Sequence, residues 1–165
     1  MIAFGHFLAQ YLASGDVVRL SGGLGAGKST LARGAISTIL KDGGYDVDDI
    51  PSPTFTLVQS YPWPGPDDGE REVWHIDLWR LEDPDEIMEL GFDEAVGRHA
   101  MLIEWPDRLG PGWTTRLSSH AIDLDIADGA DGDSDEHTRV VTITIKDSHP
   151  WAQALKMAPN IITVK

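Results

Sequence analysis

The amino-acid sequence predicts an α/β fold, in which a mixed parallel and antiparallel sheet is flanked by helices. Two observations lead to this fold class. Strand-like and helix-like segments alternate in the first part of the chain, which is typical of parallel sheets, and strands joined as hairpins follow later. The chain has 165 residues, which is enough to bury one core, so a single domain over residues 1–165 is expected.

The first part of the chain divides into five predicted elements. Apolar residues at helical spacing predict a helix over Ile2–Leu12, and the apolar run Val17–Leu20 predicts a strand. The predicted helix Lys28–Asp42 ends where two glycines follow. Two prolines hold the next segment extended, so Thr54–Tyr61 is predicted as a strand, and Glu72–Leu78 alternates as the returning strand of a hairpin.

The second part of the chain contains shorter elements. Asp83 as an N-cap and Pro84 at the first helical position predict a short helix that closes near Gly91. The continuous apolar run Ala100–Glu104 suits a buried strand of a parallel sheet. The remaining predictions are a short helical piece, two strands and a last helix: Asp93–His99, Arg116–Ile126, Thr138–Ile145 and His149–Met157.

The charge of the chain is strongly acidic. Its 27 acidic and 13 basic residues give a net charge of −14, which argues against a broad electrostatic footprint for nucleic acid. Part of the excess lies in residues 128–137, a low-complexity stretch of Asp and Gly that is predicted as an acidic surface loop. Because this stretch lacks the frame of a calcium loop, a solvated hairpin tip is the favoured interpretation.

Composition also limits the chemistry and the location. The chain has no cysteine, which excludes a disulfide framework, a thiol nucleophile and a cysteine-based metal site. No apolar run reaches the length of a membrane span, and no basic region precedes the first apolar residues, so neither a membrane segment nor a signal peptide is expected. A cytoplasmic location is therefore the expectation.

The stretch Ser21–Thr30 satisfies the pattern G-x-x-x-x-G-K-[ST] of a phosphate-binding loop, or P-loop, and lies between a predicted strand and a predicted helix. Its glycines let backbone N–H groups point at phosphate oxygens, and the helix N-terminus adds its dipole. We expect Lys28 to reach the β- and γ-phosphates and the Ser29 hydroxyl to ligate Mg²⁺. A glycine-rich turn with a chance Lys-Ser is the alternative. The expected nucleotide contacts are Gly22, Gly25, Ala26, Gly27, Lys28, Ser29 and Thr30.

Hydrolysis or transfer of a phosphoryl group needs a further acid near Mg²⁺ and a group that positions the nucleophile. Glu104 ends a continuous apolar run, and Asp77 ends an alternating strand, so both are expected beside the P-loop. Either could bind Mg²⁺ directly or through water; ordinary polar strand ends are the alternative. Thr54 could act as a switch residue or simply reflect the preference of Thr for strands. Glu104, Asp77 and Thr54 are the catalytic candidates, and Ser29 and Glu104 the metal-ligand candidates.

Other residues narrow the choice of function. The six histidines show no pair with metal-ligand spacing, and His75 is interpreted as a packed or surface residue. A guanine-specific site is not expected, because the Asn-Lys-x-Asp segment is missing and Asn160 is the single asparagine. No arginine cluster offers the lid of a small-molecule kinase. The sequence therefore favours a P-loop NTPase domain that acts on ATP.

Several stretches together resemble the TsaE family, the small bacterial ATPase subunit of tRNA threonylcarbamoyladenosine biosynthesis. The P-loop alone is shared by many families, whereas this set, in this order, is specific. Gly23 departs from the family, which often has Asp there, and residues 128–136 look like an insertion. The resemblance covers roughly Ser14–Arg108, and its matching stretches are Gly22–Thr30, Ser52–Val58, His75–Leu81, Glu86–Gly91 and Ile103–Pro106.

The resemblance implies a P-loop fold, ATP and Mg²⁺ as cofactors, and an ATPase that is weak alone and stimulated by partners. It implies work with TsaD and TsaB in a complex that modifies A37 of tRNA to threonylcarbamoyladenosine. Ser29 and Glu104 match Mg²⁺-binding positions of the family, and Thr54 and Asp77 match positions associated with the nucleotide site. A stand-alone phosphotransferase acting on a small molecule, and a non-enzymatic nucleotide-dependent interaction module, stay open as alternatives.

Overall fold

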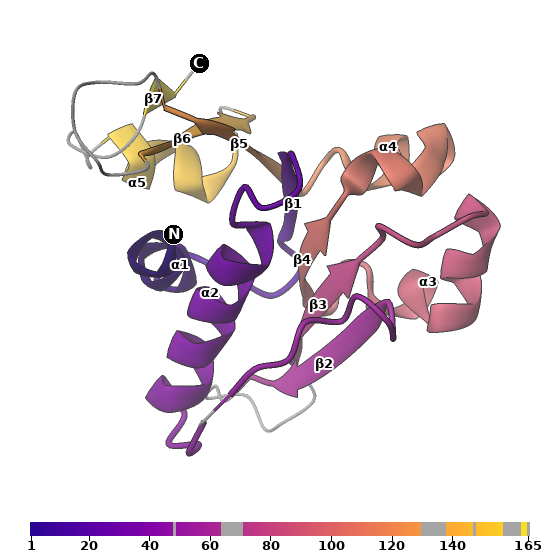
Figure 1. The fold of residues 1–165 in the computed structure, drawn as a ribbon, viewed down its shortest axis with the longest axis horizontal. Coiled ribbons are helices and arrows are strands. Elements are labelled where there is room, and N and C mark those ends of the chain that lie inside the picture. Colours follow the sequence, from indigo (N-terminus) through magenta and orange to yellow (C-terminus); the bar gives the residue numbers. More distant parts are fainter. Residues whose placement is uncertain (48, 64–70, 130–137, 147, 157–162, 165) are drawn as a thin grey trace.

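The computed structural model describes residues 1–47, 49–63, 71–129, 138–146, 148–156 and 163–164. In this part of the chain seven strands form one sheet in the order β2-β3-β4-β1-β5-β6-β7, with helices on both faces (Figure 1). The predicted α/β class with a mixed sheet is therefore confirmed. The strands are β1 Val17–Gly22, β2 Val58–Pro62, β3 Glu72–Asp77, β4 Ala100–Glu104, β5 Ala121–Asp128, β6 Arg139–Ile145 and β7 Thr163–Val164.

Parallel strands form the centre of the sheet. β1 pairs in parallel with β4 on one side and with β5 on the other, and β3 pairs in parallel with β4. β2 and β6 run antiparallel to β3 and β5. Every residue of β4 is buried, as expected for a strand covered on both faces. The carboxyl ends of β1, β3 and β4 therefore meet at one edge of the sheet.

The sheet separates two cores, one on each of its faces, and helices cover both (Figure 1). Alternate residues of β4 point to opposite faces, so Leu102 joins one core while Met101 and Ile103 join the other. The first face carries α1 Ile2–Ala9, α2 Lys28–Asp42 and α5 Pro150–Lys156. The second face carries the 3₁₀ helices η1 Pro84–Leu90 and η2 Pro106–Leu109, together with α3 Phe92–Ala95 and α4 Gly110–Leu117.

The predicted strand Thr54–Tyr61 is wrong in its first half. Residues 54–57 form a turn, in which Leu57 N donates to Pro53 O at 2.8 Å and Leu57 has a φ of 61°. The turn is held against the end of β3, because Asp77 N donates to Leu57 O at 2.9 Å. A tertiary contact thus overrides the strand preference of threonine and brings Thr54 toward the carboxyl edge of the sheet.

The predicted strand Arg116–Ile126 is also wrong in its first part, since α4 runs to Leu117 and β5 begins at Ala121. The start of α4 contains Gly110-Pro111-Gly112, a composition typical of a turn. The helix tolerates this proline because backbone N–H groups in the first helical turn have no hydrogen-bond partner within the helix.

Other predicted helices differ from the structure in length or type. The first helix ends at Ala9 rather than at Leu12. Of the predicted helical piece Asp93–His99, only residues 93–95 belong to α3, which begins one residue earlier, at Phe92. The helix capped by Asp83 is a 3₁₀ helix, in which Asp85 N donates to Asp83 Oδ1 at 3.0 Å. Of the predicted acidic loop 128–137, residues 130–137 lie outside the described residues.

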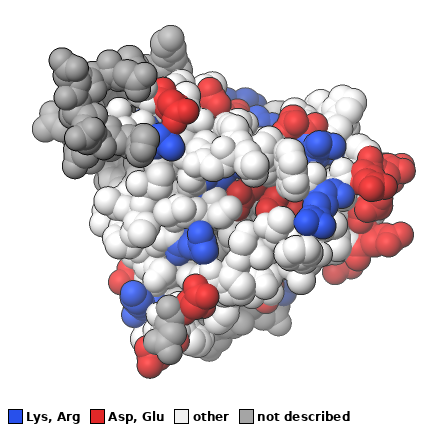
Figure 2. All heavy atoms as spheres, in the orientation of Figure 1, with Lys and Arg blue, Asp and Glu red and all other residues white. Residues whose placement is uncertain are grey.

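The surface of the described residues is rich in acids over η1 and α3, which form the right margin of Figure 2. The exposed acidic side chains of these elements and of the residues just before η1 are Glu82, Asp83, Asp85, Glu86, Glu89, Asp93 and Glu94. Within the described ranges, no helix combines the length and the apolar character that crossing a membrane requires.

Close packing of α1 on α2 predicts that Gly5→Ala destabilises the fold. A Cβ at Gly5 would overlap Leu31 O and lie 2.8 Å from Ala35 N, which are backbone atoms that cannot rotate away. Overpacking of this kind costs about 1–3 kcal/mol, which outweighs the gain of up to about 1 kcal/mol in helix propensity. Thermal unfolding followed by circular dichroism should show a melting temperature lower by several degrees.

Gly112→Ala is the matched control, because it also lies in a helix but a Cβ there meets nothing within 4 Å. Its stability should stay unchanged or rise by up to about 1 kcal/mol. A Gly5→Ala variant as stable as the wild type would contradict the described contact between the two helices.

Candidate functional site

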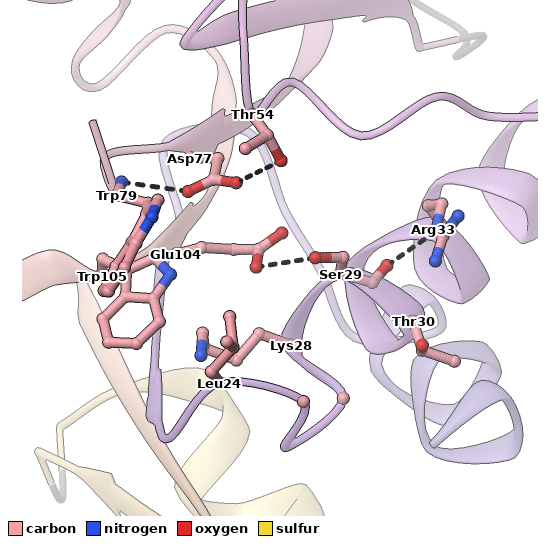
Figure 3. Close-up of a pocket in the computed structure, with 12 residues that line it drawn as sticks. Leu24, Lys28, Ser29, Thr30, Arg33, Thr54, Asp77, Trp79, Glu104 and Trp105 are labelled. Atoms are coloured by element: carbon pink, nitrogen blue, oxygen red, sulfur yellow. Dashed lines mark hydrogen bonds between the residues drawn. The ribbon is translucent and has the colours of Figure 1, made fainter. Parts of the chain in front are cut away.

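A cavity lies at the carboxyl edge of β1, β3 and β4, where it faces the N-terminus of α2 (Figure 3). The loop between β1 and α2 forms one wall, and the ends of β3 and β4 form the other. Residues far apart in the chain therefore face each other across the cavity. The lining residues are Leu24, Gly25, Gly27, Lys28, Ser29, Thr30, Arg33, Thr54, Asp77, Trp79, Glu104 and Trp105.

The loop between β1 and α2 depends on glycine at its two fixed positions. Gly22 has a φ of 137°, and a Cβ there would overlap Ile126 O of β5. Gly27 has a φ of 105° and stands at the N-cap of α2, where it has no side chain to cap the helix. The first N–H groups of the fifteen-residue helix are thus available to a ligand, and the helix dipole favours an anion there.

Lys28 is buried, with 5% of its surface exposed. Its Nζ donates to Gly22 O at 2.7 Å and to Gly23 O at 2.8 Å, and it lies 3.8 Å from the centre of the Trp105 ring. Burial lowers the pKa of Lys28, while the nearby carboxylates, first that of Glu104, oppose this shift. An ammonium group has three N–H donors, so one is left to point at an anion in the cavity.

Glu104 connects β4 to the loop and to β3. Ser29 Oγ donates to Glu104 Oε2 at 2.8 Å, and His75 Nε2 lies 2.8 Å from Glu104 Oε1. The Glu104 side chain is 2% exposed, and His75 is fully buried. Both carboxylate oxygens therefore have a partner, one on the P-loop helix and one on the neighbouring strand.

Asp77 ends β3 directly beside Glu104 in the strand register. Its Oδ2 accepts a hydrogen bond from Thr54 Oγ1 at 2.8 Å, and its Oδ1 accepts one from Trp79 N at 3.0 Å (Figure 3). Thr54 Oγ1 also lies 2.9 Å from Ser52 Oγ. The turn that follows the second proline is therefore attached to the acid at the end of β3.

Trp79 and Trp105 line the cavity, and Phe55, Arg80 and Arg108 lie within three residues of the lining residues Thr54, Trp79 and Trp105 in the sequence. We call Phe55, Trp79, Arg80, Trp105 and Arg108 the aromatic rim. The rings of Trp79 and Trp105 lie 4.4 Å apart between centres. Arg80 lies 4.4 Å from the centre of the Phe55 ring, and Arg108 lies 5.9 Å from that of Trp79. Phe55 is 80% exposed, which is unusual for a large apolar side chain.

The predicted site residues largely come together. Eight of them line the cavity: Gly25, Gly27, Lys28, Ser29, Thr30, Thr54, Asp77 and Glu104. Gly22 and Ala26 instead line a neighbouring cavity between the loop and the end of β5. Sequence reasoning missed His75, although its position two residues before Asp77 in an alternating strand places both on one face of the sheet.

The oxygen atoms in the cavity suit a hard divalent cation. Ser29 and Thr54 supply hydroxyls, and Asp77 and Glu104 supply carboxylates, which are the ligand types of Mg²⁺. Among the described residues, no group of three or more His, Cys, Asp or Glu could hold a metal ion by itself. This arrangement fits Mg²⁺, which is held by one or two carboxylates together with the phosphates of a substrate.

Sequence comparison relates the chain to one family. The model of the family described as "Threonylcarbamoyl adenosine biosynthesis protein TsaE" matches residues 1–137. A protein named "tRNA threonylcarbamoyladenosine biosynthesis protein TsaE" from Streptomyces coelicolor is 37% identical over 145 residues, which cover 87% of this chain and 89% of that protein.

Two further relatives carry the same name. The proteins from Rickettsia felis and Rickettsia prowazekii are 42% and 39% identical over 100 and 104 residues, which cover 61% and 63% of this chain. The matches span 53% and 66% of the length of these two relatives, so about half to two thirds of each is covered.

The geometry of the loop predicts that Lys28→Ala weakens the binding of a polyphosphate. Charge-assisted hydrogen bonds contribute about 1.5–3 kcal/mol, so the affinity for tripolyphosphate should fall about ten-fold or more. Isothermal titration calorimetry measures this directly. Lys41→Ala is the matched control, since it removes the same charge from the last turn of α2. Unchanged affinity in a folded Lys28→Ala variant would exclude the loop as the binding site.

Proposed function

Because this chain belongs to the TsaE family, whose fold is that of a P-loop NTPase, we propose that it binds and hydrolyses ATP with Mg²⁺ to support tRNA threonylcarbamoyladenosine modification. The observation that carries the proposal is the 2.8 Å hydrogen bond from Ser29 Oγ to Glu104 Oε2. It joins the phosphate-binding loop to an acid 75 residues away, at the end of the adjacent parallel strand.

Binding follows from the groups around the loop. The phosphates of ATP lie against the loop N–H groups and the start of α2, and the third N–H of Lys28 points at a phosphate oxygen. Ser29 would hold Mg²⁺ through its hydroxyl, and Glu104 would hold it directly or through a water molecule. The ion, when bound, neutralises phosphate charge and orients the terminal phosphate. Two carboxylates next to one ammonium group make the cavity acidic, so a bound cation would strengthen the binding of ATP.

Hydrolysis requires a group that orients the attacking water. Asp77 is the best placed, because Thr54 and the Trp79 N–H fix both of its oxygens at the end of β3. Each carboxylate oxygen has a second lone pair, which can accept a hydrogen bond from that water. Thr54 sits on the turn between α2 and β2, so its bond to Asp77 also couples this turn to the reacting end of the nucleotide.

Partner control follows from the arginines and the aromatic rim. Arg33 Nε donates to Ser29 O at 3.2 Å, Arg80 stacks on Phe55, and Arg108 lies over Trp79, so these three arginines already have contacts within the chain. An arginine supplied by a partner can raise turnover by several orders of magnitude. Exposed Trp, Phe and Arg side chains are typical of interface hot spots. We therefore assign the rim to docking of the partners that the family resemblance implies, TsaD and TsaB.

The two alternative functions differ from this proposal in the turnover they require. A stand-alone phosphotransferase would release ADP only when a small acceptor is present. An interaction module would bind ATP without turnover, alone or with partners. The aromatic rim favours a partner-dependent ATPase over the phosphotransferase, because a large partner would cover the mouth that a small acceptor must enter.

The metal and water roles predict different defects for the two acids. Glu104→Ala should weaken ATP binding about ten-fold in Mg²⁺ and leave binding in EDTA nearly unchanged, because its partner is the cation. Asp77→Asn should spare binding and lower turnover in the assembled complex about 10²–10⁴-fold. Fluorescent-nucleotide titration and phosphate release measure these effects. Glu89→Gln, an exposed acid on η1, is the control. Wild-type turnover in both site variants would refute the assignment.

Partner control predicts that hydrolysis by the isolated chain is slow and rises strongly when TsaD and TsaB are added. Phe55→Ala should raise the partner concentration needed for half-maximal stimulation about ten-fold or more, because exposed aromatic anchors dominate interfaces. ATP binding should not change, since Phe55 does not line the cavity. Val140→Ala, an exposed apolar residue on β6, is the control. Fast hydrolysis without partners would instead favour a stand-alone enzyme.

A further inference from the structure

We propose that His75 is a positioning residue, whose imidazole donates from Nε2 to Glu104 and holds this acid in place for the metal. The proposal rests on the proposed function, because it takes Glu104 to be an acid that serves Mg²⁺. Among the residues that the structure describes, His75 is the buried histidine in contact with the site, and neither the phosphate loop nor the strand-end acids account for it.

The geometry places His75 between the core and the site. The ring is fully buried on β3, where its register partner is Leu102 of β4. Nε2 lies 2.8 Å from Glu104 Oε1, while Ser29 Oγ donates to Oε2 at the same distance. The carboxylate is thus held from two sides, by a ring fixed in a strand and by the hydroxyl that the metal would use.

The hydrogen bonds of Glu104 identify which ring nitrogen of His75 is the donor. An ionised carboxylate only accepts hydrogen bonds, so Nε2 must carry the proton that points at Glu104. Among the described residues, Nδ1 of His75 is the one buried side-chain nitrogen or oxygen without a hydrogen-bond partner. Nε2 is therefore the donor in the hydrogen bond to Glu104.

This arrangement fixes the direction of Glu104. With Oε1 bound to His75, the carboxylate cannot rotate without leaving a buried acceptor unpaired, so Oε2 stays aimed at Ser29. Groups that orient metal ligands in this way typically change metal affinity or activity by about 10–100-fold when they are removed. His75 therefore acts through Glu104 and touches neither the nucleotide nor the ion.

Two substitutions separate the donor from the bulk of the ring. His75→Leu replaces the ring with an apolar side chain of moderate size and removes the donor. His75→Gln keeps an N–H near the position of Nε2. His99→Leu is the matched control, because His99 is also buried but bonds to Glu72 N, and it precedes β4 whereas Glu104 ends it. Binding of a fluorescent ATP analogue is measured against Mg²⁺ concentration and separately in EDTA.

The expected result is selective for the metal. His75→Leu should raise the Mg²⁺ concentration for half-maximal binding about 10–100-fold, and should change binding in EDTA by no more than about two-fold. His75→Gln should recover most of the Mg²⁺ response, and His99→Leu should behave as wild type. A folded His75→Leu variant with the wild-type Mg²⁺ response would overturn the proposal. An equal loss with and without Mg²⁺ would overturn it too, because that pattern indicates a general structural role.

A second measurement needs neither a variant nor a metal. ¹⁵N NMR of histidine-labelled wild-type protein distinguishes a protonated ring nitrogen from a bare one, and His75 should show a protonated Nε2. A bare Nε2 would overturn the proposal even if the variants fail to fold. Failure of the proposed function has a different signature, since wild-type nucleotide binding would then be absent or indifferent to Mg²⁺; either result would remove the metal role of Glu104, and this proposal with it.

Discussion

The register of three parallel strands decides where the polar groups of the site meet. Leu20 of β1 lies beside Glu104 of β4, and Glu104 lies beside Asp77 of β3. A slip of one residue in β4 would turn Glu104 to the opposite face of the sheet and away from Ser29. The register is specified by the apolar residues between the two cores, such as Leu102 and Ile103, which are buried on opposite faces. The packing of these core residues thus positions the polar side chains of the site, Glu104 and Asp77.

The charged side chains of the site are buried. Lys28, Asp77 and Glu104 are each at most 5% exposed, although isolated buried charges are costly. The structure offsets this cost with hydrogen bonds to loop carbonyls, hydroxyls, a backbone N–H and His75. In a chain with a net charge of −14, two carboxylates beside one ammonium group weaken the attraction of the loop for a polyphosphate, and a cation bound with the polyphosphate would offset this repulsion. The proposed need for Mg²⁺ and the proposed role of His75 follow from the same balance.

Sequence patterns predicted the local features and missed those set by tertiary contact. The glycine spacing of the loop and the acids at the ends of two strand patterns indicated the cavity, because parallel strands present their carboxyl ends together. Thr54 was expected near the site, but within a strand, whereas a turn held by Asp77 places it there. The role of His75 could not be predicted, because a histidine in an alternating strand gives the same sequence pattern whether its side chain contacts solvent, the core or an acid. The start of α4 was not predicted, because its Gly-Pro-Gly segment is typical of a turn.

A crystal structure with Mg²⁺ and a non-hydrolysable ATP analogue tests the central claim most directly. The triphosphate should lie along the loop, with Ser29 Oγ about 2.0–2.1 Å from the metal. Glu104 should contact the metal directly or through one water, and Asp77 should face the terminal phosphate. A nucleotide bound away from the loop, or a metal beyond the reach of both Ser29 and Glu104, would contradict the site described.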